Sequence, residues 1–97
     1  MSQKRSRYVI AYDIPDDRRR LKVARALEGH GERVQYSVFE CQLTGKQFRA
    51  LWQELGELIQ PVEDSLRVYR LCPVCAAWVK TAGRAVRVED VPPVYIV

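Results

Sequence analysis

A run of apolar residues at helical spacing, bounded by a start signal and a stop signal, constrains this chain more than any other feature. Thr44 and Gln47 are spaced as the two members of a capping box at the first turn of a helix. Large apolar side chains then recur on one helical face: Phe48, Leu51, Trp52, Leu55 and Ile59. Pro61 cannot continue the helix. The pattern predicts an amphipathic helix that needs an apolar surface to cover.

The N-terminal part predicts a central strand followed by another helix. Residues 7–14 are rich in β-branched and aromatic residues, which is typical of a strand with apolar side chains on both faces. Pro15, followed by two aspartates, indicates the start of a helix that runs to about Glu28. The predicted core stripe of this helix is Leu21, Ala24 and Leu27.

The middle of the chain predicts three more strands. Residues 33–43 alternate in polarity but are too long for one ordinary strand, so we expect two short antiparallel strands with a break near Ser37. Residues 65–71 alternate as a further strand. The resulting order β, α, β, β, α, β is that of an α+β, ferredoxin-like fold with an antiparallel sheet.

The C-terminal segment predicts an extension of that sheet. Residues 1–97 are expected to form a single ferredoxin-like domain, and residues 76–97 its C-terminal extension. Within the extension, residues 85–88 indicate a short strand and residues 94–97 are an apolar end that needs cover. We expect an extra strand there, which joins the sheet of its own chain or that of a second copy.

Positive charge is concentrated at the N-terminal end. Residues 1–25 hold eight of the sixteen Lys and Arg residues and only three acidic residues, whereas the rest holds eight cations and nine anions. A patch of one sign suits a polyanion, because each phosphate that a cation neutralises releases condensed counterions. The alternative is a helix face that is merely solvated.

Other features limit the class of protein. The apolar runs are far shorter than the ~20 residues that span a bilayer, and no signal peptide is evident, so we expect a cytoplasmic protein without membrane contact. Three cysteines without a secretory signal argue against a disulfide framework. Cys72 and Cys75 form half of a possible zinc site, which two copies of the chain would have to complete.

Asp13 is the candidate for chemistry. It ends the first predicted strand, directly before the helix that carries the arginines, so its carboxylate would lie next to cations that can hold phosphates. Mg²⁺ takes one or two carboxylates together with waters and substrate oxygens, so Asp13 from two copies of the chain would suffice. The alternative is that Asp13 only caps the turn before the helix.

Linked motifs, in order and at the expected spacing over about residues 7–75, resemble the CRISPR-associated Cas-two family. They are Tyr12-Asp-Ile-Pro-Asp-Asp, Arg20 with Lys22, Gly31-x-Arg33-Val-Gln-Tyr-Ser-Val-Phe-Glu40, and Leu66-Arg-Val-Tyr-Arg-Leu71. The resemblance implies a ferredoxin-like homodimer in which the C-terminal segment completes the partner's sheet. It also implies a protein of antiviral defence and spacer acquisition that works with the CRISPR integrase. Because members have been described as Mg²⁺-dependent endonucleases on RNA or DNA, the resemblance further implies that activity, with Mg²⁺ as the expected cofactor and Mn²⁺ as its substitute.

The resemblance also implies roles for individual residues. Asp13 from both subunits would hold the metal and be catalytic. The nucleic-acid-binding cations would be Arg20, Lys22 and Arg33, to which the charge cluster adds Arg18 and Arg19. Tyr12, Ser37 and Phe39 would support the cleft, Ser37 by positioning a phosphate or water and Phe39 by offering a stacking surface.

Each supporting residue also has a structural alternative. Tyr12 and Phe39 lie in predicted strands and can belong to the core, while Ser37 can simply mark the bend. Arg33 can pair with a neighbouring glutamate on the surface, an interaction that contributes little.

Two other functions compete with a nuclease. The first is a non-catalytic dimeric adaptor that bridges the integrase and holds duplex DNA on its basic face. The second is a small ferredoxin-like regulator that binds a metabolite or a partner protein, since fold does not determine function. The N-terminal concentration of positive charge argues against the regulator.

Overall fold

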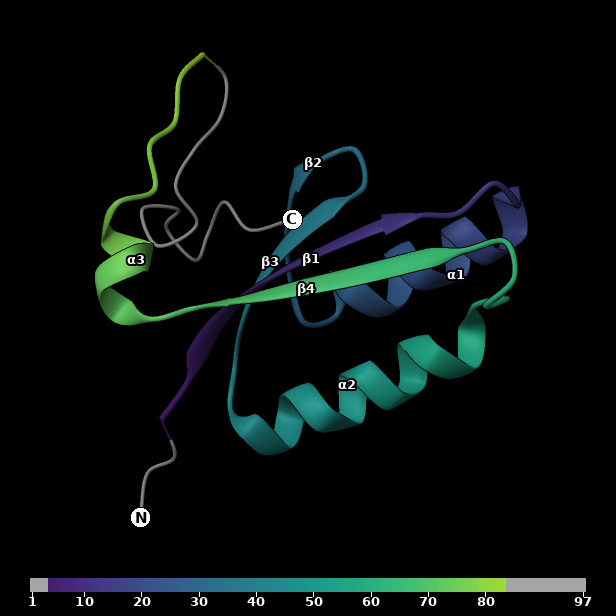
Figure 1. Ribbon diagram of the computed structural model, residues 1–97, viewed down its shortest axis with the longest axis horizontal. Coiled ribbons are helices and arrows are strands. Elements are labelled where there is room, and N and C mark those ends of the chain that lie inside the picture. Colours follow the sequence, from purple (N-terminus) through teal and green to yellow (C-terminus); the bar gives the residue numbers. More distant parts are fainter. Residues whose placement is uncertain (1–3, 84–97) are drawn as a thin grey trace.

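The computed structural model describes residues 4–83, along which strands and helices alternate (Figure 1). The strands are β1 (Ser6–Asp13), β2 (Gly31–Gln35), β3 (Val38–Leu43) and β4 (Ser65–Leu71). The helices are α1 (Asp17–Glu28), α2 (Gly45–Leu58) and the short α3 (Pro73–Ala77). From β1 to β4 the order is βαββαβ, so the predicted α+β, ferredoxin-like arrangement is confirmed.

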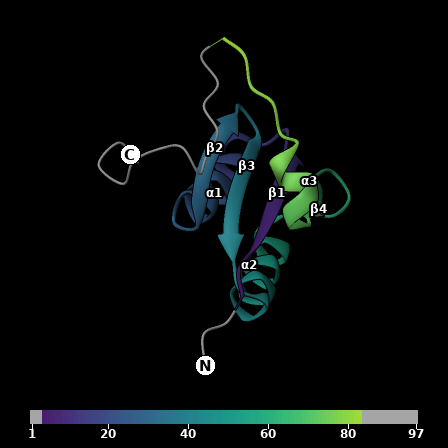
Figure 2. The ribbon, with the colours of Figure 1, turned by 90° about the vertical axis from the view of Figure 1, so that its left-hand side faces the viewer.

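The strands form one antiparallel sheet in the order β2-β3-β1-β4, seen side by side in Figure 2. β1 pairs with β3 on one side and β4 on the other, so its predicted central position is confirmed. Asp13, at the end of β1, lies opposite Ser65, at the start of β4. The register therefore places Asp13 at the end of the central strand, where the chain leaves the sheet and α1 begins.

One face of the sheet carries the core, and both long helices lie on that side (Figure 1). Side chains alternate between the two faces of a strand. The buried strand residues are Tyr8, Ile10 and Tyr12 of β1 and Phe39, Cys41 and Leu43 of β3. The helices contribute Val23, Ala24 and Leu27 from α1 and Leu51 and Leu55 from α2.

The predicted stripe of α1 was wrong at one position. Leu21 is 50% exposed, whereas Val23, Ala24 and Leu27 are buried. At 3.6 residues per turn, Val23 and Leu27 lie on one face, and Leu21 lies well outside it. A spacing of three drifts around the helix, and the burial follows the average period instead.

Both helix starts are capped by side chains. The hydroxyl of Thr44 accepts a hydrogen bond from the backbone N–H of Gln47 at 3.1 Å, and the Gln47 side chain accepts from the Thr44 N–H at 2.9 Å. The capping box is therefore confirmed. At α1 the cap is Asp16, whose carboxylate accepts from the N–H of Arg19 at 2.9 Å. Such caps satisfy backbone donors that the first turn leaves without partners.

β2 and β3 form a hairpin around a turn at residues 36–37, which confirms the predicted break near Ser37. Gly31 begins β2 opposite Cys41, and the two strands approach closely there. A Cβ atom at Gly31 would lie 2.3 Å from the Glu40 carbonyl oxygen and 2.6 Å from the Cys41 sulfur. Glycine is therefore required at this position.

The other face of the sheet is left uncovered by α1 and α2. Its apolar positions alternate with the buried ones: Val9 and Ala11 on β1, Val38 on β3 and Tyr69 on β4. Tyr69 is 50% exposed, and its hydroxyl accepts a hydrogen bond from Arg67 at 3.1 Å. The expectation that β1 is apolar on both faces is thus confirmed, with only one of the faces covered by helices.

After β4 the chain forms α3, which contacts the ends of β1 and β4 (Figure 2). The sequence patterns did not predict this helix. The predicted strands at residues 85–88 and 94–97 lie outside the described residues. None of the helices among residues 4–83 is long and apolar enough to cross a membrane.

Candidate functional site

Asp13 is the one aspartate of the β1–α1 junction whose side chain forms no hydrogen bond or ion pair with residues 4–83. Of its neighbours, Asp16 caps α1, and Asp17 forms an ion pair with Arg20. Asp13 itself is exposed at the end of β1. The structural alternative for Asp13 therefore does not hold, because another aspartate caps the helix.

Arg19 is engaged inside the fold rather than offered to a ligand. Its Nε donates to Oδ2 of Asp64 at 2.8 Å and its Nη2 donates to Oδ1 at 3.1 Å. Asp64 Oδ2 also accepts from the Gln60 backbone N–H at 2.7 Å. The hydrogen bonds from Arg19 hold the pKa of the Asp64 carboxyl below its ordinary value. Arg19 thus departs from the expected group of nucleic-acid-binding cations, because a buried carboxylate occupies its guanidinium fork.

Arg20 lies across the junction that follows Asp13. Its Nη1 donates to the carbonyl oxygens of Ile14 at 3.0 Å and Pro15 at 3.4 Å, and its Nη2 bonds the Asp17 carboxylate. The bond to Asp17 raises the pKa of the Arg20 guanidinium. Arg20 therefore holds the loop in place while part of its charge is balanced.

A cavity of about 270 Å³ beside this junction brings together several of the expected site residues. Its lining includes Tyr12, Asp17, Arg20, Leu21, Arg33 and Tyr36. Burial raises the pKa of the Tyr12 hydroxyl, an effect that nearby Arg33 opposes. The cavity thus carries two guanidinium groups and two phenols, which are donors suited to phosphate oxygens.

Phe39 and Ser37 support this cavity from behind. The Phe39 ring is fully buried, 5.3 Å from the Arg33 guanidinium carbon and 6.4 Å from the centroid of the Tyr12 ring. It therefore positions Arg33 and is not open as a stacking surface, contrary to expectation. The Ser37 carbonyl accepts a hydrogen bond from the Tyr12 N–H at 3.1 Å, which ties the hairpin turn to the end of β1.

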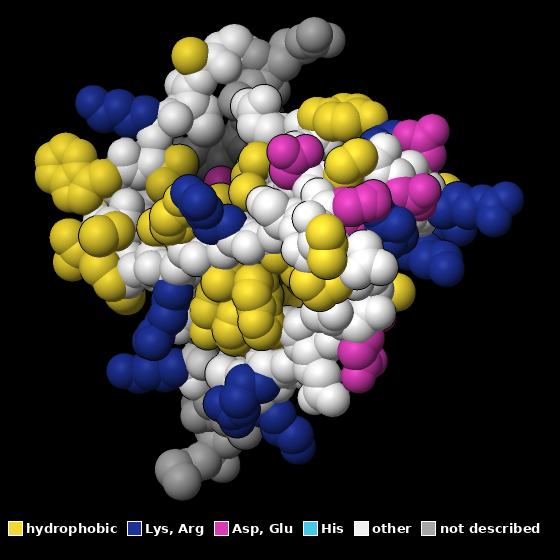
Figure 3. Space-filling view, turned by 45° about the vertical axis from the view of Figure 1, so that its right-hand side comes forward, with side chains coloured by type: hydrophobic (Ala, Val, Ile, Leu, Met, Phe, Trp, Pro, Cys, Tyr) yellow, Lys and Arg dark blue, Asp and Glu magenta, His cyan; other side chains and the backbone are white. Residues whose placement is uncertain are grey.

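Arg18 and Lys22 are exposed on α1 and form no side-chain hydrogen bond or ion pair with the described part of the chain. In Figure 3, which brings this end of the molecule forward, basic and acidic side chains are interspersed on the right. The positive charge at the start of α1 is thus partly neutralised by acidic side chains of the same chain. The count of charges along the sequence did not reveal this neutralisation.

Sequence reasoning missed two residues of this region. Tyr36 lines the cavity and is 73% exposed, and the buried Asp64 holds Arg19. Tyr36 lies inside the motif that carries the family resemblance, so its position in the sequence could have marked it as a site residue. No local pattern marks Asp64, whose partner is 45 residues away.

The cysteines are separated by burial. Cys41 is fully buried in the core, where burial raises the pKa of its thiol to about 11. Cys72 and Cys75 are exposed around the start of α3, and the Cys75 N–H donates to the Cys72 sulfur at 3.3 Å. Among residues 4–83, no group of three or more His, Cys, Asp or Glu side chains is arranged to hold a metal.

Comparisons with known proteins agree with this geometry. Residues 6–78 match the family described as CRISPR associated protein Cas2. A relative from Synechocystis, "CRISPR-associated endoribonuclease Cas2 3", is 62% identical over 66% of this chain and 70% of its own length. A relative from Chloroflexus aurantiacus, "CRISPR-associated endoribonuclease Cas2 1", is 46% identical over 93% of this chain and 98% of its own.

Solved structures share the fold. The crystal structure of Streptococcus pyogenes Cas2 superimposes with a TM-score of 0.71 at 32% identity, over 79% of this chain and 99% of that one. A chain of the "Partial Cas6-RT-Cas1--Cas2 complex" gives a TM-score of 0.69 at 31% identity, over 78% of this chain and 89% of that one. These matches confirm the resemblance found in the sequence motifs, and the chain belongs to the CRISPR associated protein Cas2 family.

Proposed function

We propose that this protein is a metal-dependent endonuclease of CRISPR-based antiviral defence, acting on RNA or DNA phosphodiesters. The relatives from Synechocystis and Chloroflexus aurantiacus are both named endoribonucleases, which supports the nuclease over a purely structural adaptor. One observation carries the assignment to a site. Asp13 is exposed at the end of β1 without a side-chain partner among residues 4–83, and its neighbour Tyr12 lines a cavity that holds two arginines, although Asp13 itself does not line it.

Asp13 is suited to a hard divalent cation, because a free carboxylate oxygen is the ligand that Mg²⁺ takes from proteins. Mn²⁺ would substitute through the same oxygens. When bound, the ion supplies a water activated for attack on phosphorus. Arg20 and Arg33 bind the phosphate oxygens, while Tyr12 and Ser37 hold the cleft around them. Arg18 and Lys22 extend the positive surface along α1.

A homodimer would complete the site, since one carboxylate is a weak metal site. The uncovered face of the sheet, with Val9, Ala11, Val38 and Tyr69, is an apolar surface that a second copy would bury. Asp13 lies at the end of the same face, because it alternates in phase with Val9 and Ala11. The C-terminal segment, residues 76–97, would add a strand to the partner's sheet.

The test is cleavage of labelled RNA and duplex DNA by Asp13→Asn, with Asp16→Asn as the matched control. Both changes remove one negative charge from the β1–α1 junction, and Asn still caps a helix well. We expect Asp13→Asn to lower the rate by roughly 100-fold or more in Mg²⁺ or Mn²⁺ and Asp16→Asn to cut normally. Sedimentation should give a dimer for both. Equal activity of the two variants would refute the role of Asp13.

We also propose that the protein assembles with the CRISPR integrase. The structural neighbour from a complex whose title contains both Cas1 and Cas2 supports this partner. Co-purification of the two proteins, with Asp13→Asn still binding, is the expected result. An integrase that fails to co-purify with the wild-type protein would refute the assembly.

A further inference from the structure

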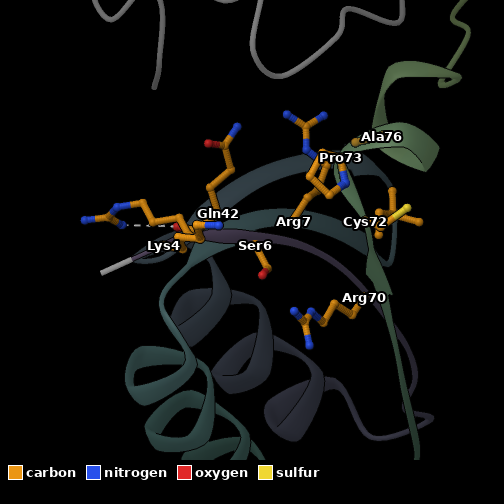
Figure 4. A pocket seen from close by; sticks show the side chains of 10 residues that line it. Lys4, Ser6, Arg7, Gln42, Arg70, Cys72, Pro73 and Ala76 are labelled. Carbon is orange, nitrogen blue, oxygen red and sulfur yellow. Dashed lines mark hydrogen bonds between the residues drawn. The ribbon is translucent and has the colours of Figure 1, made fainter. Parts of the chain in front are cut away.

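A second cavity lies at the opposite end of β1 from Asp13, and the site described above does not use it. It has a volume of about 500 Å³ and is lined by the N-terminal residues of the chain, the end of β4 and the start of α3 (Figure 4). Its cations are Lys4, Arg5, Arg7 and Arg70. We call these four residues the basic pocket.

Within the described part of the chain, most cations of the basic pocket have no acidic partner. Among the described residues Arg7 pairs with one carboxylate, that of Glu40, at 3.4 Å. Arg5 is held by uncharged acceptors, the Gln42 carbonyl oxygen at 3.3 Å and Gln47 Oε1 at 3.2 Å. Lys4 and Arg70 are exposed, without a side-chain hydrogen bond or ion pair to residues 4–83. Lys4, Arg5 and Arg70 thus have no carboxylate partner among residues 4–83.

The register of the sheet places these cations on both faces of the same strand ends. Arg7 pairs with Leu71 across β1 and β4, while Arg70 pairs with the adjacent Tyr8, so Arg7 and Arg70 point to opposite faces. Figure 4 shows Arg7 and Gln42 extending to one side of the strands and Arg70 to the other. A compact anion contacts one face only, whereas a chain of phosphates can wrap around the edge and contact both.

We propose that the basic pocket binds backbone phosphates of a nucleic acid, as a contact separate from the Asp13 site. This inference rests on the proposed function, which supplies the polymer. Guanidinium groups match phosphate oxygens in geometry as well as charge. The apolar lining consists of Leu71, Cys72, Pro73 and Ala76, without an aromatic ring on which a base could stack. The pocket is therefore expected to bind the phosphate backbone of the nucleic acid without preference for its base sequence.

The distance between the Asp13 site and the basic pocket sets a minimum length for a nucleic acid that contacts both. Seven residue steps along β1 separate Ser6 from Asp13, which at about 3.3 Å per residue is roughly 23 Å. A ligand that reaches both sites must span that distance. At about 3.4 Å per nucleotide in a stacked strand, this takes about seven nucleotides. A dinucleotide therefore cannot contact both.

The experiment measures binding of a labelled RNA of about 20 nucleotides over a range of salt concentrations. The variants are Arg70→Gln and Lys4→Gln, with Arg25→Gln on α1 as the matched charge control. We expect each pocket variant to weaken binding by about three- to tenfold and to lower the slope of log K against log salt by about 0.7. Binding of a dinucleotide at the Asp13 site should not change. Equal losses in Arg70→Gln and Arg25→Gln would overturn the proposal.

Cys72 provides a readout that does not depend on affinity, because its exposed thiol lines the same cavity. Saturating RNA should slow alkylation of Cys72 by iodoacetamide in wild type and Arg25→Gln, and less so in Arg70→Gln. Unchanged alkylation in the RNA complex would overturn the proposal. So would a polyglutamate peptide that protects Cys72 when RNA does not, because the occupant would then be an acidic protein segment.

The outcomes also separate this proposal from the proposed function. If wild type cuts RNA, Asp13→Asn does not, and the pocket variants bind as wild type does, then only the pocket assignment fails. If wild type neither binds nor cuts RNA or DNA, both proposals fail. Weakened binding in the pocket variants together with normal binding of Asp13→Asn is the result that we expect.

Discussion

Arg19 and Asp64, 45 residues apart in the sequence, are joined by two hydrogen bonds of 2.8 and 3.1 Å. This fork ties the first turn of α1 to the loop that leads into β4. The Asp64 side chain is fully buried, and its remaining bond is to the N–H of Gln60, so the loop between α2 and β4 is held as well. Arg19, which the sequence suggested as a nucleic-acid-binding residue, therefore stabilises the contact between α1 and the α2–β4 loop. This contact lies at the same end of the sheet as Asp13.

Asp64 should make stability depend on acid. The bonds from Arg19 lower the pKa of its carboxyl below 3.8, so the stabilisation is complete above that value and is lost as the pH falls through the lower folded-state pKa. We expect Asp64→Asn to lower the melting temperature at neutral pH and to flatten its decline on acidification. Glu57→Gln, on the exposed side of α2, is the control and should melt as wild type does at both pH values.

Arg18 and Arg19 should differ although they are adjacent. Arg18 is exposed and unpaired among residues 4–83, so Arg18→Gln should weaken nucleic-acid binding by about threefold and leave the melting temperature unchanged. Arg19→Gln should lower the melting temperature, because it leaves the buried Asp64 carboxylate without its partner. Thermal melts and salt-dependent binding of the two variants decide this. The reverse pattern would contradict the assignment of Arg19 to the fold.

Two glycines should respond to alanine with opposite signs. At Gly31 a Cβ atom would lie 2.3 Å from a backbone oxygen of β3, so Gly31→Ala should destabilise the protein by about 1–3 kcal/mol or more. At Gly56, inside α2, a Cβ atom would meet nothing within 4 Å. Gly56→Ala should therefore stabilise the protein by about 0.5–1 kcal/mol. Urea unfolding of both variants measures the two effects, and a neutral Gly31→Ala would contradict the observed strand pairing.

The cysteines should react with alkylating reagents at different rates. The hydrogen bond from the Cys75 N–H lowers the pKa of the Cys72 thiol, whereas burial raises that of Cys41 to about 11. We expect iodoacetamide at neutral pH to modify Cys72 first and to leave Cys41 unmodified until the protein unfolds. Peptide mass spectrometry over time identifies the modified residues. Early modification of Cys41 in folded protein would contradict its burial.

The elements themselves were predictable from the sequence, because each depends on residues close together in the chain. The Thr44–Gln47 capping box and the apolar period after it predicted α2, and both are confirmed. The β-branched run of β1 and the break near Ser37 predicted the central strand and the hairpin. The order of these elements was enough to indicate the fold, and the linked motifs were enough to indicate the family.

Which side chains meet was decided only by the tertiary structure. The pairing register of β1 with β4 brings Arg70 to the N-terminal cations, and the same packing takes Arg19 into a buried ion pair. It also leaves Asp13 unengaged while Asp16 and Asp17 are bound. Local patterns cannot predict these relationships. The sequence shows that a residue is charged but not which residue it contacts. Its role depends on partners that strand register and helix packing bring from distant parts of the chain.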